Sequence, residues 1–579
     1  MTDTASPPEA APAKPEPRLR LWPALLIVAV HLSVSLYTLY FGATNKQSMV
    51  GFIGAPVLAL LLLTVWWLAA SRAPWRARLV GLLLVTAALL CTFGIQGANG
   101  QFHLLFTLPV MTTVLVAALA VTSGMSWRLR RWVLAGVVVA CTLGVNTLRA
   151  EGLSSSLTPV LAWRWSPTAA ELLHAAPVAE ADGTAVLPAQ AGPGDWPAFR
   201  GPARDNRVTG VKFSTDWSTP PRELWRKRIG LGWSSYAAVG DYIFTLEQRD
   251  REELVTCSRA DTGADVWVNR TQTHYDNDMG GSGPRATPTF DQGRLYTLGA
   301  TGTLQCLDAA TGKAVWTRDI KADAETGVPG WGFSSSPLVV GTRLIVFTNA
   351  GDGKSVIAYE LQSGNPVWRA GHGGGGYSSP QLSVLCDTPQ VLMAGEFGLW
   401  SLAPETGQLL WERAVAKEMN PRCAQPLVAE GNTVLLGSPA GAGARMFQIQ
   451  KNDSAWTVEE KWISRKYRPY FNDSVFFKGH AYGFDGDRLA CLDTATGEMC
   501  WQGKRHGGQV LLLPDMEMLL VVSEKGEAIL VPATPTEYKE VARFKALNGK
   551  TWNHPTIAHG KLFVRNAEEA ACFALPGAQ

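Results

Sequence analysis

A short phrase recurs along the last two-thirds of this chain, and it restricts the possible folds more than any other feature. An apolar strand end is followed by Asp-x-x-Thr-Gly or a close variant, then by a few residues and a Trp. The copies are RADTGADVW (259–267), LDAATGKAVW (307–316), ELQSGNPVW (360–368), LAPETGQLLW (402–411) and LDTATGEMCW (492–501), with a decayed copy at IQKNDSAWTVEEKW (449–462). Repetition at a regular spacing predicts a repeat architecture.

The spacing of the Trp residues predicts a β-propeller. They follow one another at intervals of about 40–50 residues, which is the length of one four-stranded blade. The residues are Trp225, Trp267, Trp316, Trp368, Trp411, Trp462 and Trp501. Each phrase predicts a hairpin in which Gly accepts a positive φ in the turn. We expect the Trp ring to fill the space between neighbouring blades.

A second phrase, in which a Pro or small residue precedes an apolar stretch, Gly and another apolar stretch, supplies the first two strands of each blade. Together the two phrases put blade starts near residues 233, 284, 333, 377, 422, 471, 508 and 552. The last start is followed by only three strands, whereas RELWRKRIG (222–230) has no blade of its own. We expect this strand to complete the last blade and leave no free sheet edge. The predicted fold class is an all-β eight-bladed β-propeller over 195–579; seven blades is the alternative, because 508–547 matches the pattern least.

The first 150 residues have a different composition and predict a membrane domain. Five stretches are long and apolar enough to cross a bilayer, at 21–43, 50–70, 79–96, 103–122 and 132–148. None contains the acidic residues that a transport path needs. We therefore interpret 21–148 as a five-helix transmembrane anchor, with a quinone pocket between the helices as the alternative.

The basic residues predict the orientation of this anchor, because Lys and Arg concentrate in cytoplasmic segments. They lie in the N-terminal tail (Lys14, Arg18, Arg20), in the second loop (Arg72, Arg76, Arg78) and in the fourth loop (Arg128, Arg130, Arg131). Residues 1–20 are then a disordered cytoplasmic tail, 149–194 is an Ala/Pro-rich linker, and 195–579 lies on the periplasmic side. The predicted location is the inner (cytoplasmic) membrane, multi-pass. The first predicted partner is the lipid bilayer itself.

The iterated Asp-x-x-Thr-Gly-x-x-x-Trp phrase resembles the pyrroloquinoline quinone (PQQ) repeat β-propeller superfamily over about 195–579. The segment DWPAFRGPARDNRVTG (195–210) resembles the Trp-Pro opening of quinoprotein dehydrogenase domains. Five helices before a periplasmic propeller also resemble membrane-bound quinoprotein glucose dehydrogenase. This resemblance implies PQQ and Ca²⁺ as possible cofactors. The superfamily also contains non-enzymatic BamB-like members, for which the resemblance implies protein partners.

The sequence departs from the dehydrogenases of this superfamily in several motifs. It has no adjacent Cys pair and no haem-binding Cys-x-x-Cys-His. No catalytic residue is assignable, and no metal-ligand set can be aligned. The predicted propeller has few long insertions that could form the walls of a substrate pocket. A fold alone does not define an activity. The missing motifs favour the interpretation that this protein is not an enzyme.

Residues just before each innermost strand should line the central funnel of the propeller. The register selects Trp233, Arg285, Ser334, Tyr377, Cys423, Phe471 and Trp552, and their neighbours add Asn472, Asp473, Asn553 and His554. The candidate cofactor-binding residues among them are Trp233, Arg285, Tyr377, Asn472, Asp473 and Trp552. Aromatic faces stack on flat ligands, Arg pairs with carboxylates, and oxygen ligands suit calcium. Packing of the channel throat is the alternative role for the same residues.

Two other features are weaker candidates. The loop HYDNDMGGSG (274–283) has closely spaced acidic and amide residues but lacks the spacing and distal Glu of an EF-hand, so it is a calcium loop, a partner loop or a plain surface loop. Cys491 and Cys500 lie on one predicted hairpin, where an oxidising compartment would permit a disulfide. Cys257, Cys306 and Cys491 share one register, which predicts small core residues.

Three functions remain open on these grounds. The first is a membrane-anchored propeller that binds a protein or envelope ligand, acting as a scaffold. The second is a PQQ-dependent dehydrogenase that oxidises an alcohol or sugar and passes electrons to membrane quinone. The third, a sensor, is weakened because no cytoplasmic signalling domain is present. The net charge of +3 with no basic run in the last two-thirds gives no support to nucleic-acid binding.

Overall fold

The structure is a computed structural model of the 579-residue chain. It describes residues 19–41, 50–97, 100–154, 159–174, 183–277, 280–416, 421–438 and 443–578. The predicted disordered tail lies almost wholly outside these residues. The chain divides into two compact units, Met1–Ser166 and Pro167–Gln579, and each is considered by itself.

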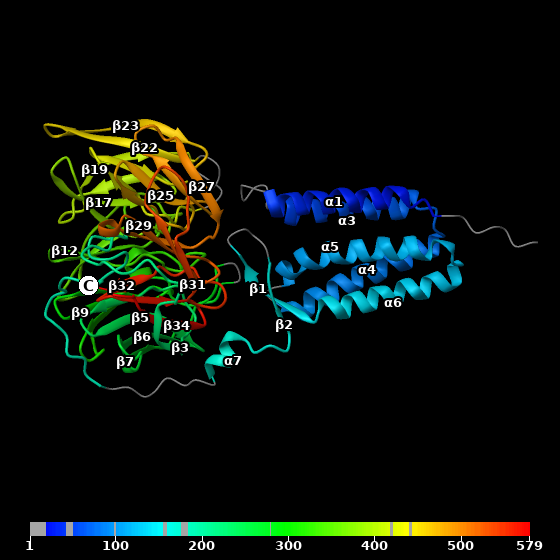
Figure 1. The fold of residues 1–579 in the computed structure, drawn as a ribbon, viewed down its shortest axis with the longest axis horizontal. Helices are drawn as coiled ribbons and strands as arrows, with labels where there is room; N and C mark the ends of the chain where they lie inside the picture. The colour runs from blue at the N-terminus through cyan, green and yellow to red at the C-terminus, as the bar shows by residue number, and fades with distance from the viewer. Residues whose placement is uncertain are drawn as a thin grey trace, which may run out of the picture. The chain divides into compact units, whose positions relative to one another are not determined.

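The first unit is a helical bundle followed by a β-hairpin (Figure 1). Its helices are α1 (Trp22–Phe41), α3 (Ala55–Val65) with π-helical turns at Val50–Gly54 and Trp66–Ala70, α4 (Trp75–Gln96), α5 (Gly100–Val121) and α6 (Trp127–Val145). The hairpin pairs β1 (Leu148–Leu153) with β2 (Pro159–Trp163). This hairpin lies in the segment that was expected to be an irregular linker.

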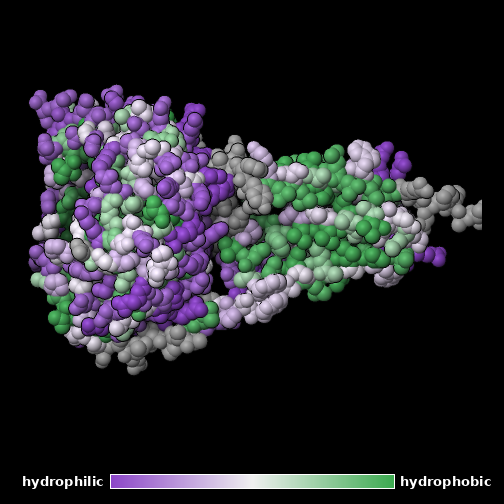
Figure 2. Space-filling model, in the orientation of Figure 1, coloured by the Kyte–Doolittle hydropathy of each residue, from purple (hydrophilic) through white to green (hydrophobic). Residues whose placement is uncertain are grey.

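Among the described residues of this unit, three helical stretches are long and apolar enough to cross a membrane: Val50–Ala70, Trp75–Gln96 and Gly100–Gly124. Helix α1 adds a shorter apolar stretch, Trp22–Thr38. Helix α6 starts with three arginines within its first five residues, which lowers its apolar character. The sides of the helices are covered by apolar residues (Figure 2), and Leu83, Leu90 and Leu143 are each 68% exposed. The prediction of five spans is therefore supported at three of them.

The second unit is an eight-bladed propeller made of eight four-stranded antiparallel sheets. The first four blades are β4–β7 (Ala237–Val239, Tyr242–Arg249, Glu252–Arg259, Asp265–Thr271), β8–β11 (Thr289–Asp291, Arg294–Leu298, Thr303–Asp308, Ala314–Asp319), β12–β15 (Leu338–Val340, Arg343–Phe347, Val356–Glu360, Pro366–Ala370) and β16–β19 (Gln381–Leu385, Thr388–Ala394, Gly398–Leu402, Leu409–Ala414).

The next three blades are β20–β23 (Leu427–Ala429, Thr433–Leu436, Ala444–Asn452, Ala455–Ser464), β24–β27 (Val475–Phe477, His480–Asp485, Arg488–Asp493, Met499–Arg505) and β28–β31 (Gln509–Leu513, Met518–Val522, Glu527–Pro532, Ala542–Lys545). The last blade is β32 (Thr556–Ala558), β33 (Lys561–Arg565), β34 (Glu569–Ala574) and β3 (Arg222–Arg228). Short helices α7 (Ala169–His174) and α8 (Ile320–Ala324) lie outside the blades.

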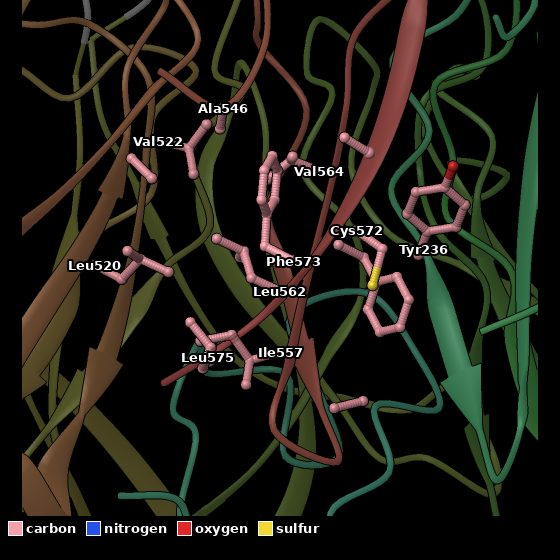
Figure 3. Close-up of a cluster of buried hydrophobic side chains, with 14 of the residues drawn as sticks. Tyr236, Leu520, Val522, Ala546, Ile557, Leu562, Val564, Cys572, Phe573 and Leu575 are labelled. Atoms are coloured by element: carbon pink, nitrogen blue, oxygen red, sulfur yellow. The ribbon is translucent and has the colours of Figure 1, made fainter. Parts of the chain in front are cut away.

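The ring closes as the sequence predicted. Strand β3 comes from before the first blade and pairs antiparallel with β34, the third strand of the last blade. The closing blade packs on its neighbours through a continuous apolar core, in which Phe573 and Leu562 lie between Leu520 and Tyr236 (Figure 3). The blade at 509–545 has all four strands. Eight blades are therefore confirmed, and seven is wrong.

The recurring phrase forms a contact between consecutive blades, between a Trp and a turn Gly, which we call the clasp. The Trp of one blade packs on the turn Gly of the next: a Cβ built on that Gly would lie 2.4–2.7 Å from the Trp ring. The pairs are Trp225–Gly263, Trp267–Gly312, Trp316–Gly364, Trp368–Gly407 and Trp462–Gly497. These turn glycines also have φ of +68° to +77°, so they meet two requirements that only Gly satisfies. The expected packing role of the Trp rings is thereby confirmed.

The Trp indoles also donate hydrogen bonds across the blade boundary. Trp267 Nε1 donates to the Ala309 carbonyl at 3.0 Å, and Trp225 Nε1 donates to the Ala260 carbonyl at 3.0 Å. Trp411 is the exception, since its indole donates to Gln390 Oε1 within its own blade. The following blade contains the decayed copy of the phrase, which has no turn Gly.

Candidate functional site

The sequence-predicted funnel residues come together at one end of the central channel. Each lies in the segment that leads into the innermost strand of its blade: Trp233 before β4, Arg285 before β8, Tyr377 before β16, Asn472 and Asp473 before β24, and Trp552 before β32. Because all blades run in the same sense around the ring, these segments share one mouth.

The mouth is bordered by a continuous run of aromatic rings, which we call the aromatic rim. Successive ring-centroid distances are 4.9 Å for Trp233–Trp552, 5.2 Å for Trp552–Phe471, 5.4 Å for Phe471–Tyr470, 6.3 Å for Tyr470–Trp331 and 5.1 Å for Trp331–Tyr377. All six side chains are half-buried. Two of them, Trp331 and Tyr470, were not predicted. The sequence did contain a signal for both. Tyr470 lies one position before Phe471 and Trp331 lies three positions before Ser334, which are the residues that the register selected.

The loop at 274–283 contacts the rim at Trp233 and the segment next to Trp331. Trp233 Nε1 donates to the Gly280 carbonyl at 2.6 Å, and the Arg285 guanidinium donates to the same carbonyl at 3.1 Å. On the other side, the Tyr275 hydroxyl donates to the Gly330 carbonyl at 2.6 Å, next to Trp331. The described part of the loop is thus held in place by hydrogen bonds. One of its three closely spaced polar residues, Asp278, lies outside the described residues.

Two cations lie within the rim. Lys550 Nζ is 4.1 Å from the Trp552 ring centroid and 5.3 Å from that of Trp233, distances typical of cation–π contacts. The Arg285 guanidinium lies 5.1 Å from the Tyr275 ring. Burial lowers the pKa of Arg285 to about 10, so this side chain remains charged at neutral pH. The rim therefore combines aromatic faces with positive charge.

A second, polar layer lies deeper in the channel, around Asp473. Its carboxylate forms an ion pair with Arg200, with 3.1 Å between Oδ2 and Nε, and both side chains are almost fully buried. Its Oδ1 accepts a hydrogen bond from the Gln425 backbone N–H at 2.8 Å. His554 Nε2 is 3.7 Å from Oδ2. Burial lowers the pKa of His554 to about 4, so this imidazole is neutral at pH 7.

Arg200 belongs to a segment, residues 195–208, that we call the plug. The plug forms backbone bridges to two innermost strands, from Trp196 to Ala238 and from Arg207 to Leu512. Its side chains and carbonyls reach further blades at Phe290, Ser336, Pro337, Gln381, Ser474, Phe476 and His554. The channel is thus filled by the chain itself. This segment is the Trp-Pro opening noted in the sequence.

Arg204 of the plug holds the opposite wall. Its guanidinium donates to the Pro337 carbonyl at 2.8 Å and to the Ser336 carbonyl at 3.0 Å. Burial, together with repulsion from Arg200, lowers the pKa of Arg204 to about 9. Such a buried cation without a carboxylate partner is tolerated because backbone carbonyls accept its hydrogen bonds.

The polar layer does not fit a calcium ion. The Asp473 carboxylate faces the Arg200 cation, its Oδ1 accepts the Gln425 N–H while its Oδ2 has no hydrogen-bond partner in the described structure, and Asn472 donates its amide to the Gly508 carbonyl. No group of three or more His, Cys, Asp or Glu side chains arranged for a metal occurs among the described residues. The rim offers stacking faces to a flat cofactor, but Trp233 and Trp552 contact each other and leave no slot between them.

The cysteines do not form a site. Cys491 and Cys500 are both free thiols, Cys491 buried and Cys500 exposed. Cys257, Cys306 and Cys491 are buried, and each is paired across its hairpin with the Trp of the recurring phrase. They are small core residues, as their shared register predicted.

The fold and the clasp define this unit as a PQQ-like repeat β-propeller. A family model described as outer membrane protein assembly factor BamB matches residues 251–502. The chain is 28% identical over 192 residues to the BamB of Burkholderia pseudomallei strain K96243, a match that covers 32% of this chain and 45% of that protein. The chain thus spans less than half the length of this relative.

Similar folds occur among solved structures. BamB from Moraxella catarrhalis has 17% identity and a TM-score of 0.46, covering 61% of this chain and 99% of that one. The quinohemoprotein alcohol dehydrogenase from Comamonas testosteroni has 13% identity and a TM-score of 0.48, covering 67% and 81%. At these identities the likeness concerns the fold only. The propeller is BamB-like in its repeats.

Proposed function

We propose that this protein is a membrane-anchored scaffold whose PQQ-like repeat propeller binds a protein or envelope partner outside the cytoplasm. The anchor is the five-helix domain 21–148, which makes it a multi-pass protein of the inner membrane. The name of the similar factor, outer membrane protein assembly factor, supports a partner in the cell envelope. The propeller then lies in the periplasm.

The observation that carries this proposal is the Arg200–Asp473 ion pair. A quinoprotein dehydrogenase would use a carboxylate such as Asp473 for calcium or for catalysis. Here the carboxylate is neutralised by an arginine from the plug, and the plug fills the channel below the rim. A buried ion pair of this kind is costly to separate. The plug is therefore a permanent part of the packing in the central channel.

The aromatic rim is the proposed docking site. Aromatic and arginine side chains dominate the binding energy of protein interfaces, and the rim presents half-exposed rings next to Arg285 and Lys550. A photo-crosslinking amino acid at Tyr470 in the full chain should capture a discrete partner in living cells. The same amino acid at the exposed Glu459 on outer strand β23 is the matched control. Equal labelling at both positions would contradict docking at the rim.

The second candidate is a PQQ-dependent dehydrogenase that oxidises an alcohol or sugar and passes electrons to membrane quinone. The aromatic and cationic composition of the rim is the observation that favours it. In this case PQQ would have to stack on the outer faces of Trp233, Trp552 or Tyr377. Asn472 and Asp473 would have to leave their present partners before they could bind calcium.

A further inference from the structure

A groove of about 680 Å³ runs between helices α3, α4, α5 and α6 of the first unit. Its lining is mostly Leu, Val, Ala and Trp, but one end carries three arginines, Arg76, Arg128 and Arg131. Arg76 lies in the first turn of α4, and the other two lie in the first turns of α6. Since α4 and α6 both start at this end of the bundle, the cations share one end of the groove.

These three arginines differ from their neighbours in what they contact. Arg78 donates to the carbonyls of Leu68 and Ala73, and Arg130 donates to those of Thr122 and Ser123. Those two arginines therefore satisfy the C-terminal carbonyls of preceding helices. Residues 21–150 contain no Asp or Glu, so the described part of the helical bundle offers the groove arginines no carboxylate. Their charge is available to an anion.

The length of the groove matches one bilayer leaflet. It follows α4 from Arg76 to Leu89 and α6 from Arg128 to Val138. At a rise of 1.5 Å per residue these spans are about 20 Å and about 15 Å. Half of the hydrocarbon core of a bilayer is about 15 Å. An acyl chain that starts at the arginines would thus end near the mid-plane.

The rings at the arginine end fit the headgroup region. Trp66, Trp67, Trp127 and Trp132 all line the groove near this end, and Trp is enriched at the membrane interface. A neutral quinone head would leave three cations without a counter-charge. A zwitterionic lipid would bring its own cation next to them. The charge of the site therefore favours an anionic head on an apolar tail.

We propose that the groove is a binding site for an anionic phospholipid, with the phosphate at Arg76, Arg128 and Arg131 and one acyl chain between the helices. This proposal rests on the proposed membrane anchoring of the first unit. It assigns to the helices a lipid-specific role in addition to anchoring the propeller.

The test uses the full chain reconstituted in phosphatidylcholine vesicles. Phosphatidylglycerol or phosphatidylcholine with brominated acyl chains is titrated in, and quenching of Trp fluorescence gives the relative affinity of each lipid. The wild type should prefer phosphatidylglycerol at least about tenfold, since each basic residue near an anionic lipid adds about fivefold. The triple variant R76Q/R128Q/R131Q should lose this preference. Arg72→Gln, which removes an exposed charge outside the groove, should keep it.

A second variant separates the groove from simple surface charge. Ala135→Phe fills the groove from α6 and leaves every arginine in place. We expect it to lose the preference as well, with quenching by phosphatidylcholine retained as proof of insertion. Retained preference in A135F or in the triple variant would overturn the proposal. So would displacement of the brominated lipid by a soluble ubiquinone analogue. If neither lipid quenches the wild type, the helices are not in the bilayer and the anchor proposal is wrong.

Discussion

Asp473 is the side chain on which the two proposed functions of the propeller differ most. Its position before an innermost strand is the same whether it binds calcium, a substrate or an arginine. In the structure it forms an ion pair with Arg200, which comes from a segment far away in the sequence. A buried carboxylate held in an ion pair is costly to free, because separation would leave two unpaired charges.

We predict that Arg200→Met destabilises the propeller strongly. The substitution leaves the Asp473 carboxylate buried without its partner, which costs about 3–5 kcal/mol. Guanidinium unfolding of the full chain, followed by Trp fluorescence, measures the loss. Arg222→Met at an exposed position of β3 should change stability by less than about 0.5 kcal/mol. The double variant R200M/D473L should recover part of the loss; no recovery would mean that the ion pair is not the cause.

His554 gives a pH-dependent prediction. Burial disfavours the charged imidazole and lowers the pKa of His554 from its ordinary value of 6.5 to about 4 in the folded chain. Neutral His554 therefore contributes full stability above pH 6.5, and this contribution is lost as pH falls toward 4, by up to about 3 kcal/mol. His554→Gln should flatten the stability profile between these pH values. His274→Gln, at an exposed site, should leave the profile as in the wild type; an unchanged profile in H554Q would contradict the assignment.

At the scale of the element, the blade is defined by its clasp to the next blade. The turn Gly and the Trp are close in the sequence of each repeat, but their contact is between consecutive repeats. The repeat therefore specifies the association of blades as well as the hairpin. The Asp of the phrase supports the turn locally: Asp308 Oδ1 accepts from the Thr311 N–H at 3.0 Å and from its hydroxyl at 2.9 Å.

The clasp predicts unequal effects of two similar glycine substitutions. Gly312 and Gly293 have φ of +68° and +71°, but a Cβ on Gly312 would meet the Trp267 ring at 2.4 Å, whereas a Cβ on Gly293 meets nothing within 4 Å. Gly293→Ala should cost about 1 kcal/mol for the backbone alone. Gly312→Ala should cost about 1–3 kcal/mol more, because the blades must separate. Denaturant unfolding of both variants measures this difference, and equal losses would show that Trp267 does not press on the turn.

The sequence predicted these elements well, and the reason is physical. Turn Gly, alternating strands and spaced Trp residues are local signals, so the eight blades, the closing strand β3 and the buried Cys register could all be inferred. The positions of Trp233, Arg285, Tyr377, Asn472, Asp473 and Trp552 followed from the same register. Their partners could not be inferred, because Lys550, Gln425 and Arg200 approach from other segments. The plug has no strand periodicity of its own and was recognised only as a motif.

At the scale of the whole molecule, the proposed function combines a membrane anchor with a propeller that binds a partner. Among the described residues, three helical stretches are long and apolar enough to span a membrane. The proposed five spans also require α1 and α6 to cross it. The proposed five spans and cytoplasmic N-terminus would place everything after residue 150 outside the cytoplasm. Helix α6 has arginines only at its start, which is where the positive-inside rule places the cytoplasmic side.

Fusions to alkaline phosphatase test this topology. In a Gram-negative host, a fusion after Ser166 should be active, because the enzyme folds only outside the cytoplasm, where its disulfides form. A fusion after Ser126, in the arginine-rich loop, should be inactive. The reverse pattern, or activity at both sites, would contradict five spans with a cytoplasmic N-terminus.

The central claim is that the propeller is a scaffold whose channel is filled by its own chain. Titration of the purified full chain with PQQ and Ca²⁺, followed by cofactor absorbance and by dye reduction with alcohols and sugars, tests it most directly. The account predicts no saturable binding in the micromolar range and no dye reduction, with the same result for the rim variant Trp552→Ala. Stoichiometric PQQ binding with turnover that is lost in Asp473→Asn would contradict it and establish a dehydrogenase.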